Sequence, residues 1–301
     1  MSESHLLPFN FGGIADSHYV DFDRARILVW PIPYEGTVSY GRGTASGPSA
    51  IIDASRNMEL YDEEINDSVY RLGIHTLPEL KSLDDPGAMM QQIEDWAGKL
   101  FDTGKFLVTL GGEHSISGPI VRALGRRVDA LSVLQVDAHT DLRDTYDDTR
   151  HSHTSIMARV VEVCPAVQVG IRSISEIEAK RLPETPTTIF WARDIIGRTD
   201  WYDEAISHLT EYVYLTIDID GLDPSLVPST GAPEPGGLGW YDVIGIVRAT
   251  AQARHIIGMD VTELAPLPGN RAPDFLAARL VYKSLSYIFQ HEIRTAISTI
   301  R

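Results

Sequence analysis

Short apolar runs alternating with helical patterns constrain the fold of this chain more than any other feature. Seven runs are continuous and apolar, as expected of strands buried on both faces of a sheet. These predicted strands are Ile27–Ile32, Phe106–Leu110, Leu131–Val136, Ala166–Ile171, Thr187–Phe190, Tyr212–Ile217 and His255–Val261. The predicted helices between them are Pro48–Asn57, Gly87–Thr103, Ile116–Leu124, Ile177–Leu182, Trp201–His208, Tyr241–Ala253 and Pro273–Phe289. The alternation predicts a single α/β domain over residues 1–301, with a mainly parallel sheet.

Acidic residues and histidines follow four of these strands, whereas the strand interiors carry almost none. In chain order they are His114; Asp137, His139 and Asp141; Asp218 and Asp220; and Glu263. Ligands of such sheets bind beyond the carboxyl ends of the strands, where these residues are expected to meet. Four endings of this kind are hard to obtain from a chance placement of surface charge.

The stretch "LQVDAHTDLRDTY" has three metal-ligand types in alternate positions, Asp137, His139 and Asp141. Residues spaced by two lie on the same side of an extended chain. Grouped carboxylates are costly to bury unless a positive charge compensates them, so the pattern indicates a metal site. A strand-end loop with surface charges would also explain "DAHTD" alone, but it does not explain the second pair, Asp218 and Asp220, or "GGEH".

The ligand types favour two manganese ions. Four aspartates and two histidines form the expected ligand set, and two divalent ions bring the carboxylate charge close to neutrality. Carboxylates with some imidazole suit manganese better than zinc, and the one cysteine, Cys164, supplies no thiolate pattern. Two ions about 3.5–4 Å apart can share a water and lower its pKa, which gives a hydroxide nucleophile near neutral pH.

Charge and composition limit the kinds of partner and the location that we expect for this protein. The net charge of −16 argues against nucleic-acid binding; it fits cationic small molecules, or solubility alone. The sequence has no run of about 18 apolar residues that would span a membrane. The N-terminal residues show no basic region followed by a long apolar stretch, so we expect no secretory signal and a cytoplasmic location.

Four motifs, "GGEHS", "DAHTD", "DIDGLDP" and "MDVTELAP", resemble the signatures of the ureohydrolases, the arginase and agmatinase family. The resemblance extends from "PIPYEGTVSYGRGTASGPSAI" to the last helix. It implies a dimanganese enzyme that hydrolyses a guanidinium group to urea and an amine. It also implies a three-layer α/β/α domain with an eight-stranded parallel sheet, one strand more than the periodicity predicts.

The resemblance assigns a role to each ligand position. His114 and Asp141 would bind one manganese, His139 and Asp220 the other, and Asp137 and Asp218 would bridge the two ions. Gly111 and Gly112 have two readings, as a turn or as a close approach of the backbone to the site. Glu113 stands where the family more often has Asp, and it is not a ligand.

Two further residues match catalytic positions of the family. Glu263 resembles the acid that holds the substrate guanidinium through paired hydrogen bonds, although a surface glutamate is the alternative. His153, in "HSHTS", resembles the histidine proposed to carry protons to the leaving amine. His151 lies two residues away, and the spacing alone does not choose between them.

The substrate expected from the resemblance is agmatine, which would yield putrescine and urea for polyamine biosynthesis. "DLRDTY" resembles prokaryotic agmatinases and lacks the asparagine that arginases have after "DAHTD". Arg143 leaves alternatives open, because it could receive a substrate carboxylate or else pair with Asp144 or a neighbouring subunit. The other guanidines are guanidinobutyrate, guanidinopropionate, arginine and free guanidine.

Proteins without this activity are the remaining alternatives. A zinc deacetylase of the same broad fold would have fewer Asp and His ligands than this chain. A non-catalytic metal-binding regulatory subunit would be expected to have lost ligands. The resemblance also implies a homo-oligomer, a trimer or a hexamer.

Overall fold

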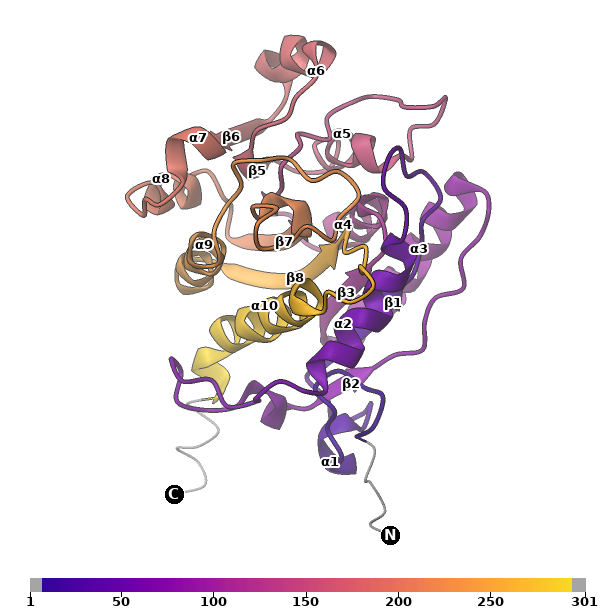
Figure 1. Cartoon of the computed structure of the whole chain (residues 1–301), viewed down its shortest axis with the longest axis vertical. Helices are drawn as coiled ribbons and strands as arrows, with labels where there is room; N and C mark the ends of the chain where they lie inside the picture. Colours follow the sequence, from indigo (N-terminus) through magenta and orange to yellow (C-terminus); the bar gives the residue numbers. More distant parts are fainter. Residues whose placement is uncertain (1–6, 294–301) are drawn as a thin grey trace.

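A computed structural model of the protein describes residues 7–293. Its eight strands form one parallel sheet in the order β2-β1-β3-β8-β7-β4-β5-β6, which confirms the fold class (Figure 1). The strands are β1 (Ile27–Ile32), β2 (Ile74–Thr76), β3 (Phe106–Gly111), β4 (Leu131–Val136), β5 (Ala166–Ile171), β6 (Thr187–Trp191), β7 (Tyr212–Asp218) and β8 (His255–Thr262). Seven of them start at the predicted residue and end within one residue of the predicted end.

The helices are α1 (Ser17–Val20), α2 (Gly47–Ser55), α3 (Pro86–Phe101), α4 (Ser117–Gly125), α5 (Ile156–Val160), α6 (Glu176–Arg181), α7 (Ala192–Ile195), α8 (Tyr202–Ser207), α9 (Trp240–Ala253) and α10 (Ala272–Ile288). Local side-chain chemistry explains where α3 begins. Asp85 caps α3 by accepting a hydrogen bond from the Ala88 N–H at 2.7 Å, and Pro86 occupies the first turn.

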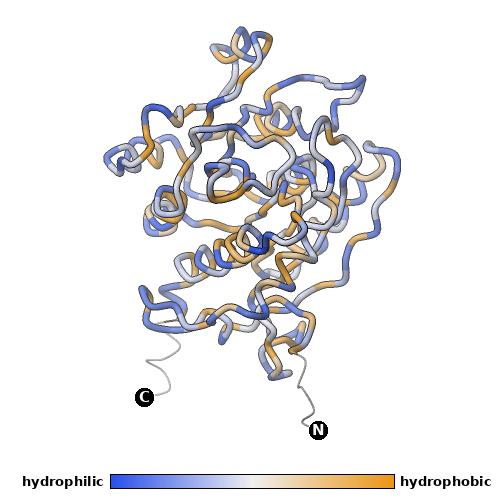
Figure 2. The backbone as a smooth tube through the Cα atoms, in the orientation of Figure 1, coloured by the Kyte–Doolittle hydropathy of each residue, from blue (hydrophilic) through white to orange (hydrophobic). Residues whose placement is uncertain are grey.

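Helices cover both faces of the sheet and make the three layers. On one face α2, α8, α9 and α10 pack on strand residues such as Val29, Val108 and Leu215. On the other face α3, α4 and α5 pack on alternate residues such as Leu28, Leu107 and Val133. Figure 2 shows the apolar segments concentrated in the interior of the molecule. Because both faces are buried, the strands read as continuous apolar runs.

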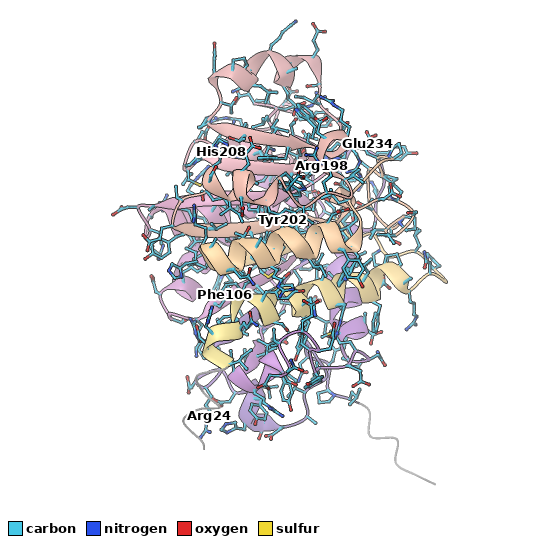
Figure 3. All side chains as sticks on the ribbon, turned by 90° about the vertical axis from the view of Figure 1, so that its left-hand side faces the viewer. Arg24, Phe106, Arg198, Tyr202, His208 and Glu234 are labelled. Atoms are coloured by element: carbon cyan, nitrogen blue, oxygen red, sulfur yellow. The ribbon has the colours of Figure 1, made fainter. Side chains whose placement is uncertain are left out.

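Chain topology brings distant segments together at the centre of the sheet. Strand β8 lies between β3 and β7, and β7 lies beside β4. All strands are parallel, so the loops that follow β3, β8, β7 and β4 meet at one edge. Figure 3 shows Glu234, from a loop after β7, on the side of the molecule opposite Phe106, which begins β3, and His208, which precedes β7.

No helix within residues 7–293 is long and apolar enough to cross a membrane.

Candidate functional site

The seven acidic and histidine residues predicted to meet do so at the carboxyl edge of the sheet. His114 begins a 3₁₀ turn shortly after β3, and Asp218 is the last residue of β7. Asp220 lies in the 3₁₀ turn that follows, and its N–H donates to the Asp218 carboxylate at 2.9 Å. The strand order β3-β8-β7-β4 therefore places ligand types from four strands side by side.

One group forms around His114. Its Nδ1 lies 3.1 Å from Oδ2 of Asp137, 3.2 Å from Oδ2 of Asp141 and 3.4 Å from Oδ2 of Asp218. All four side chains are buried. His114, Asp137 and Asp218 point ligand atoms at one another closely enough to hold a metal ion.

A second group forms around His139. Its Nδ1 lies 3.0 Å from Oδ2 of Asp220 and 3.6 Å from Oδ1 of Asp137. Asp137 thus turns one carboxylate oxygen toward each histidine and belongs to both groups, as a bridging ligand would. Asp218 faces His114 alone through Oδ2, so its second bridging contact stays a prediction.

Electrostatics show that this cluster needs positive charge. Burial and the negative charge of Asp137 raise the pKa of Asp141 to about 7. Burial opposes the charged form of His139, but the carboxylates of Asp220 and Asp137 outweigh it and raise its pKa to about 12. Without metal, protons therefore supply the charge that divalent ions would supply. Carboxylate oxygens and imidazole nitrogens in this ratio fit a pair of hard divalent ions such as Mn²⁺.

A buried chain of hydrogen bonds orients His114. Its Nε2 lies 2.8 Å from Oγ1 of Thr216, which donates to Asp260 at 2.6 Å. The Tyr214 hydroxyl donates to the other oxygen of Asp260 at 2.7 Å. Because Nε2 is engaged in this chain of hydrogen bonds, Nδ1 faces the carboxylates. Outer hydrogen-bond partners of metal-bound histidines commonly fix the orientation of the ring in this way. Asp260 is an exception to the expected absence of acids within strands, and sequence reasoning missed it.

Glu263 is buried beside the first group in a backbone conformation that is rare for a glutamate. Its φ is +65°, in the left-handed region, and the conformation is fixed from two sides. Its N–H donates to the Gly112 carbonyl at 2.7 Å, and its Oε1 accepts from the His114 N–H at 2.6 Å. Oε2 lies next to Gly231, and both residues line a cavity of about 170 Å³.

The surroundings of Gly112 distinguish the two roles considered for the Gly111-Gly112 pair, a turn or a close approach of the backbone. A Cβ on Gly112 would lie 2.1 Å from the carbonyl oxygen of Tyr34, so only glycine lets the β3 and β1 loops touch. The Glu113 N–H donates to the same carbonyl at 2.8 Å. The glycine brings the β1 loop against the site, which supports the close-approach reading.

His153 and not His151 lies in the cavity. His153 lines it together with His139 and Glu263. His151 instead lines a separate small cavity with Arg122 and other residues near α4. Burial and the positive charge of His114 lower the pKa of His153 to about 4, so its imidazole is neutral at pH 7. Its nitrogens lie 3.3 Å from the hydroxyls of Thr37 and Ser39.

Glu113 is a structural anchor that sequence reasoning missed. The side chain is fully buried and accepts hydrogen bonds from the Thr37 N–H at 2.6 Å and the Thr37 hydroxyl at 2.7 Å. Thr37 in turn accepts from the His153 N–H at 3.1 Å. Glu113 therefore ties the β1–α2 loop and His153 together, across 76 residues of sequence that carry no signal of the contact.

Arg143 lines the cavity but does not pair with Asp144, so that alternative is wrong. Asp144 pairs with Arg159 at 2.6 Å. Arg143 lies over the Tyr146 ring, 5.5 Å from its centre, with Nε 3.8 Å from Oε2 of Glu178. Glu178 is already bonded to the Thr140 hydroxyl and to the backbone and hydroxyl of Ser175. Arg143 is consequently held near the cavity by stacking and charge.

The fold and site define a parallel α/β protein with two adjacent groups of metal-ligand residues at the carboxyl edge of its sheet. Comparison with known proteins agrees. The model of the Arginase family matches residues 25–286, so the chain belongs to the arginase family and is a hydrolytic enzyme of the ureohydrolase type. The family resemblance predicted from the four motifs is thereby confirmed.

Individual relatives extend the comparison. The chain is 41% identical to an N(1)-aminopropylagmatine ureohydrolase of Synechocystis over 87% of this chain and 89% of the relative. It is 30% identical to an agmatinase of Bacillus anthracis over 85% and 89% of the two chains. The crystal structure of the agmatine ureohydrolase of Thermoplasma volcanium superposes with a TM-score of 0.87, at 26% identity, over 97% and 98% of the two chains.

Proposed function

We propose that this enzyme is a dimanganese ureohydrolase that hydrolyses agmatine to putrescine and urea. The position of Asp137 carries the proposal, because it faces two histidine groups beside a cavity that also holds Glu263 and His153. In this proposal one ion takes His114 and Asp141 and the other takes His139 and Asp220. Asp137 and Asp218 contact both.

Glu263 would bind and orient the substrate. Its Oε1 is engaged by the His114 N–H, and Oε2 remains on the cavity side, where it can accept from a guanidinium N–H. A bound cation favours the ionised carboxylate, although burial and the charge of Glu113 raise its pKa well above the usual range when the site is empty of cations. When bound, two divalent ions supply charge and a water of lowered pKa for hydrolysis.

His153 would handle the proton that the leaving amine requires. Its imidazole is neutral at pH 7, so it can accept a proton on a ring nitrogen and pass it on. Thr37 and Ser39 lie beside its two nitrogens and hold the ring on the cavity wall.

N(1)-aminopropylagmatine is a second candidate substrate, favoured by the name of the relative at 41% identity. It contains the agmatine skeleton with an added aminopropyl group, so the same metal and Glu263 chemistry serves both. We further propose that residues 1–301 form a single catalytic domain and that the enzyme is cytoplasmic, acts in polyamine biosynthesis and forms a homo-oligomer. The single domain rests on the alternation of strands and helices, and polyamine biosynthesis and the homo-oligomer rest on the family resemblance.

Urea release from purified, manganese-loaded protein tests the proposal. We expect kcat/KM for agmatine or N(1)-aminopropylagmatine to exceed that for arginine by a factor above about 100, because leaving a buried carboxylate unpaired costs several kcal/mol. Arg143→Ala is assayed in parallel with guanidinobutyrate and guanidinopropionate. If a guanidino acid is the best substrate and Arg143→Ala removes that advantage, the agmatine assignment fails and the ureohydrolase assignment stands. A protein with both metals that releases urea from none of these guanidines would be the regulatory alternative.

A further inference from the structure

We propose that Glu234 is the residue that recognises the distal ammonium of the substrate, so that the enzyme selects guanidines carrying a second cation. This inference rests on the proposed ureohydrolase function and names the substrate class: linear alkylguanidines with a protonated amine four carbons from the guanidine nitrogen. Glu263 would hold one end of the molecule and Glu234 the other.

One wall of the cavity runs from Glu263 along Gly231 and Ala232, and Glu234 lies just beyond these lining residues. A Cβ on Gly231 would lie 3.5 Å from Oε2 of Glu263, and Gly231 and Ala232 both line the cavity. Glu234 follows two residues later, with Oε1 3.9 Å from Nε2 of His139, which is also a lining residue. Exposure rises along this wall, because the Glu263 residue is 6% exposed and the Glu234 side chain 39%. Glu234 is therefore the more exposed of the two carboxylates, and Figure 3 shows it on the side of the molecule opposite Phe106 and His208.

The backbone around Glu234 is held firmly. Arg172 donates to the Glu234 carbonyl through Nε at 3.2 Å and Nη2 at 2.8 Å. The same guanidinium also donates to the carbonyls of Asp220 and Gly221, at 2.7 Å and 3.1 Å, beside the metal ligands. Asp223 accepts from the N–H groups of the next two glycines, at 3.0 Å and 2.9 Å. The carboxylate of Glu234 is thus attached to a fixed frame that includes the metal-binding loop, so a ligand meets a preorganised group.

The carboxylate itself is free to accept. Within residues 7–293 no donor lies within hydrogen-bonding distance of the Glu234 side chain, and its nearest charged neighbour is the His139 ring at 3.9 Å. Arg172 donates to backbone carbonyls and not to this carboxylate, although the two opposite charges attract each other. A second contact joins the wall to the β1–α2 loop, where the Gly41 N–H donates to the Gly231 carbonyl at 3.1 Å.

The chain from Gly231 to Glu234 is long enough to span the length of the substrate. Six bonds separate the guanidinium carbon of agmatine from its amine nitrogen, which is about 7 Å at the roughly 1.2 Å per bond of an extended chain. The three residues from Gly231 to Glu234 span at most about 11 Å. An ammonium at that distance can reach Glu234 while the guanidinium stays at Glu263. In N(1)-aminopropylagmatine the secondary amine occupies the same position, so Glu234 would serve both candidates.

A competing role for Glu234 is to orient His139, since outer carboxylates commonly accept from the free N–H of a metal-bound histidine. That role predicts loss of activity on every guanidine and weaker metal binding. Recognition of the ammonium predicts loss only on substrates with the second cation. The two roles are therefore separated by a substrate that lacks the amine.

The experiment compares agmatine with pentylguanidine, in which a methyl group replaces the ammonium, on Glu234→Gln. We use the manganese-loaded full chain and measure kcat/KM by urea release, bound manganese, and Kd by calorimetry for any compound that is not hydrolysed. The matched control is Glu176→Gln, which removes the same charge from an 81% exposed side chain of α6 that is paired with Lys180. Because Kd is measured where turnover is absent, failure of the hydrolysis proposal leaves this test intact.

We expect Glu234→Gln to lower kcat/KM, or raise Kd, for agmatine by about 10–100-fold, which is the range for a charge-assisted hydrogen bond. Pentylguanidine should change less than about twofold, manganese content should be unchanged, and Glu176→Gln should match the wild type. Relative activity on guanidinobutyrate should rise, because a carboxylate repelled by Glu234 would be tolerated by Gln. An equal loss on agmatine and pentylguanidine, or no loss on either, would overturn the proposal.

Discussion

At the scale of single residues, Asp137 is the side chain that the two candidate metal groups share. Its two carboxylate oxygens face different histidines, 3.1 Å from His114 and 3.6 Å from His139. Because Asp137 belongs to both groups, its loss should weaken the binding of both ions. Loss of His114 leaves the group around His139 complete, so it should affect mainly one ion. The same neighbourhood raises the pKa of both histidines, because carboxylates outnumber the positive charges.

Metal binding should therefore release protons. The carboxylates of Asp220 and Asp137 outweigh burial and hold the pKa of His139 at about 12, so this ring is protonated at pH 8 without metal. Asp137 and Asp141 likewise raise the pKa of His114 well above its usual value, against the effect of burial. A metal-bound imidazole nitrogen must be deprotonated, and manganese affinity should fall as the pH falls. Calorimetry in buffers of different ionisation enthalpy should show at least about one proton released per pair of ions. Release of none would mean that the histidines are not ligands.

His153→Ala should fold and keep its metals but lose turnover by about 10²–10⁴-fold, the usual contribution of acid–base catalysis. The side chain lines the cavity without facing the carboxylates of the two metal groups. Steady-state urea release and metal analysis check this. His151→Ala is the matched control, because His151 lies outside the cavity. If His151→Ala loses the activity and His153→Ala retains it, the assignment of the two histidines is reversed.

At the scale of elements, the β1–α2 loop is the part of the site that the sheet does not position. Glu113 anchors its first turn at Thr37, and Glu35 anchors its end by accepting from the N–H groups of Gly43 and Ala45, at 3.0 Å and 3.1 Å. The loop supplies Thr37 and Ser39 to His153 and closes one wall of the cavity.

Glu113→Gln should loosen this loop without removing the metals. The amide offers one acceptor where the carboxylate offers two, so a Thr37 donor is left facing an N–H group, a loss of about 1–3 kcal/mol. We expect kcat/KM for agmatine to fall at least about tenfold with unchanged manganese content. Ser115→Ala, which removes a third donor to Glu113 but no loop contact, is the control and should have the smaller effect. Unchanged kinetics in Glu113→Gln would show that the loop does not need this anchor.

The strands were predictable because their chemistry is local. A strand buried on both faces must be apolar throughout, so β1, β4 and β5 are visible with correct bounds. Strand β2 was missed because it has three residues at the edge of the sheet, of which two are only partly buried. Its apolar signal is too short for periodicity to detect.

The site was predictable only where ligand types follow strands. The six predicted ligand residues and Glu263 occupy such positions and carry a family pattern. Glu113 and Asp260 act through hydrogen bonds with Thr37 and Thr216, and Glu234 lies beside His139; all three partners are far away in sequence. The spacing of residues along the chain does not reveal contacts that depend on the order of the strands in the sheet.

At the scale of the whole molecule, the metals should contribute to stability. The ligands come from the ends of β3, β4 and β7, so bound ions link segments more than 100 residues apart. Ligands that bind only the folded state stabilise it by about 2.7 kcal/mol when present at 100 times Kd. Chelation should lower the melting temperature by several degrees, measured by calorimetry before and after manganese is restored. No change on chelation would place the metals outside the folded core of the site.

The proposed activity depends on two manganese ions acting together. The most direct measurement titrates metal-free protein with Mn²⁺ and follows bound metal and urea release from agmatine and N(1)-aminopropylagmatine on the same samples. We predict that activity reaches its maximum at two bound ions per chain, and that Asp137→Asn fails to retain either ion while His114→Asn mainly weakens one. Full activity with a single ion, or with a single zinc, would contradict the account.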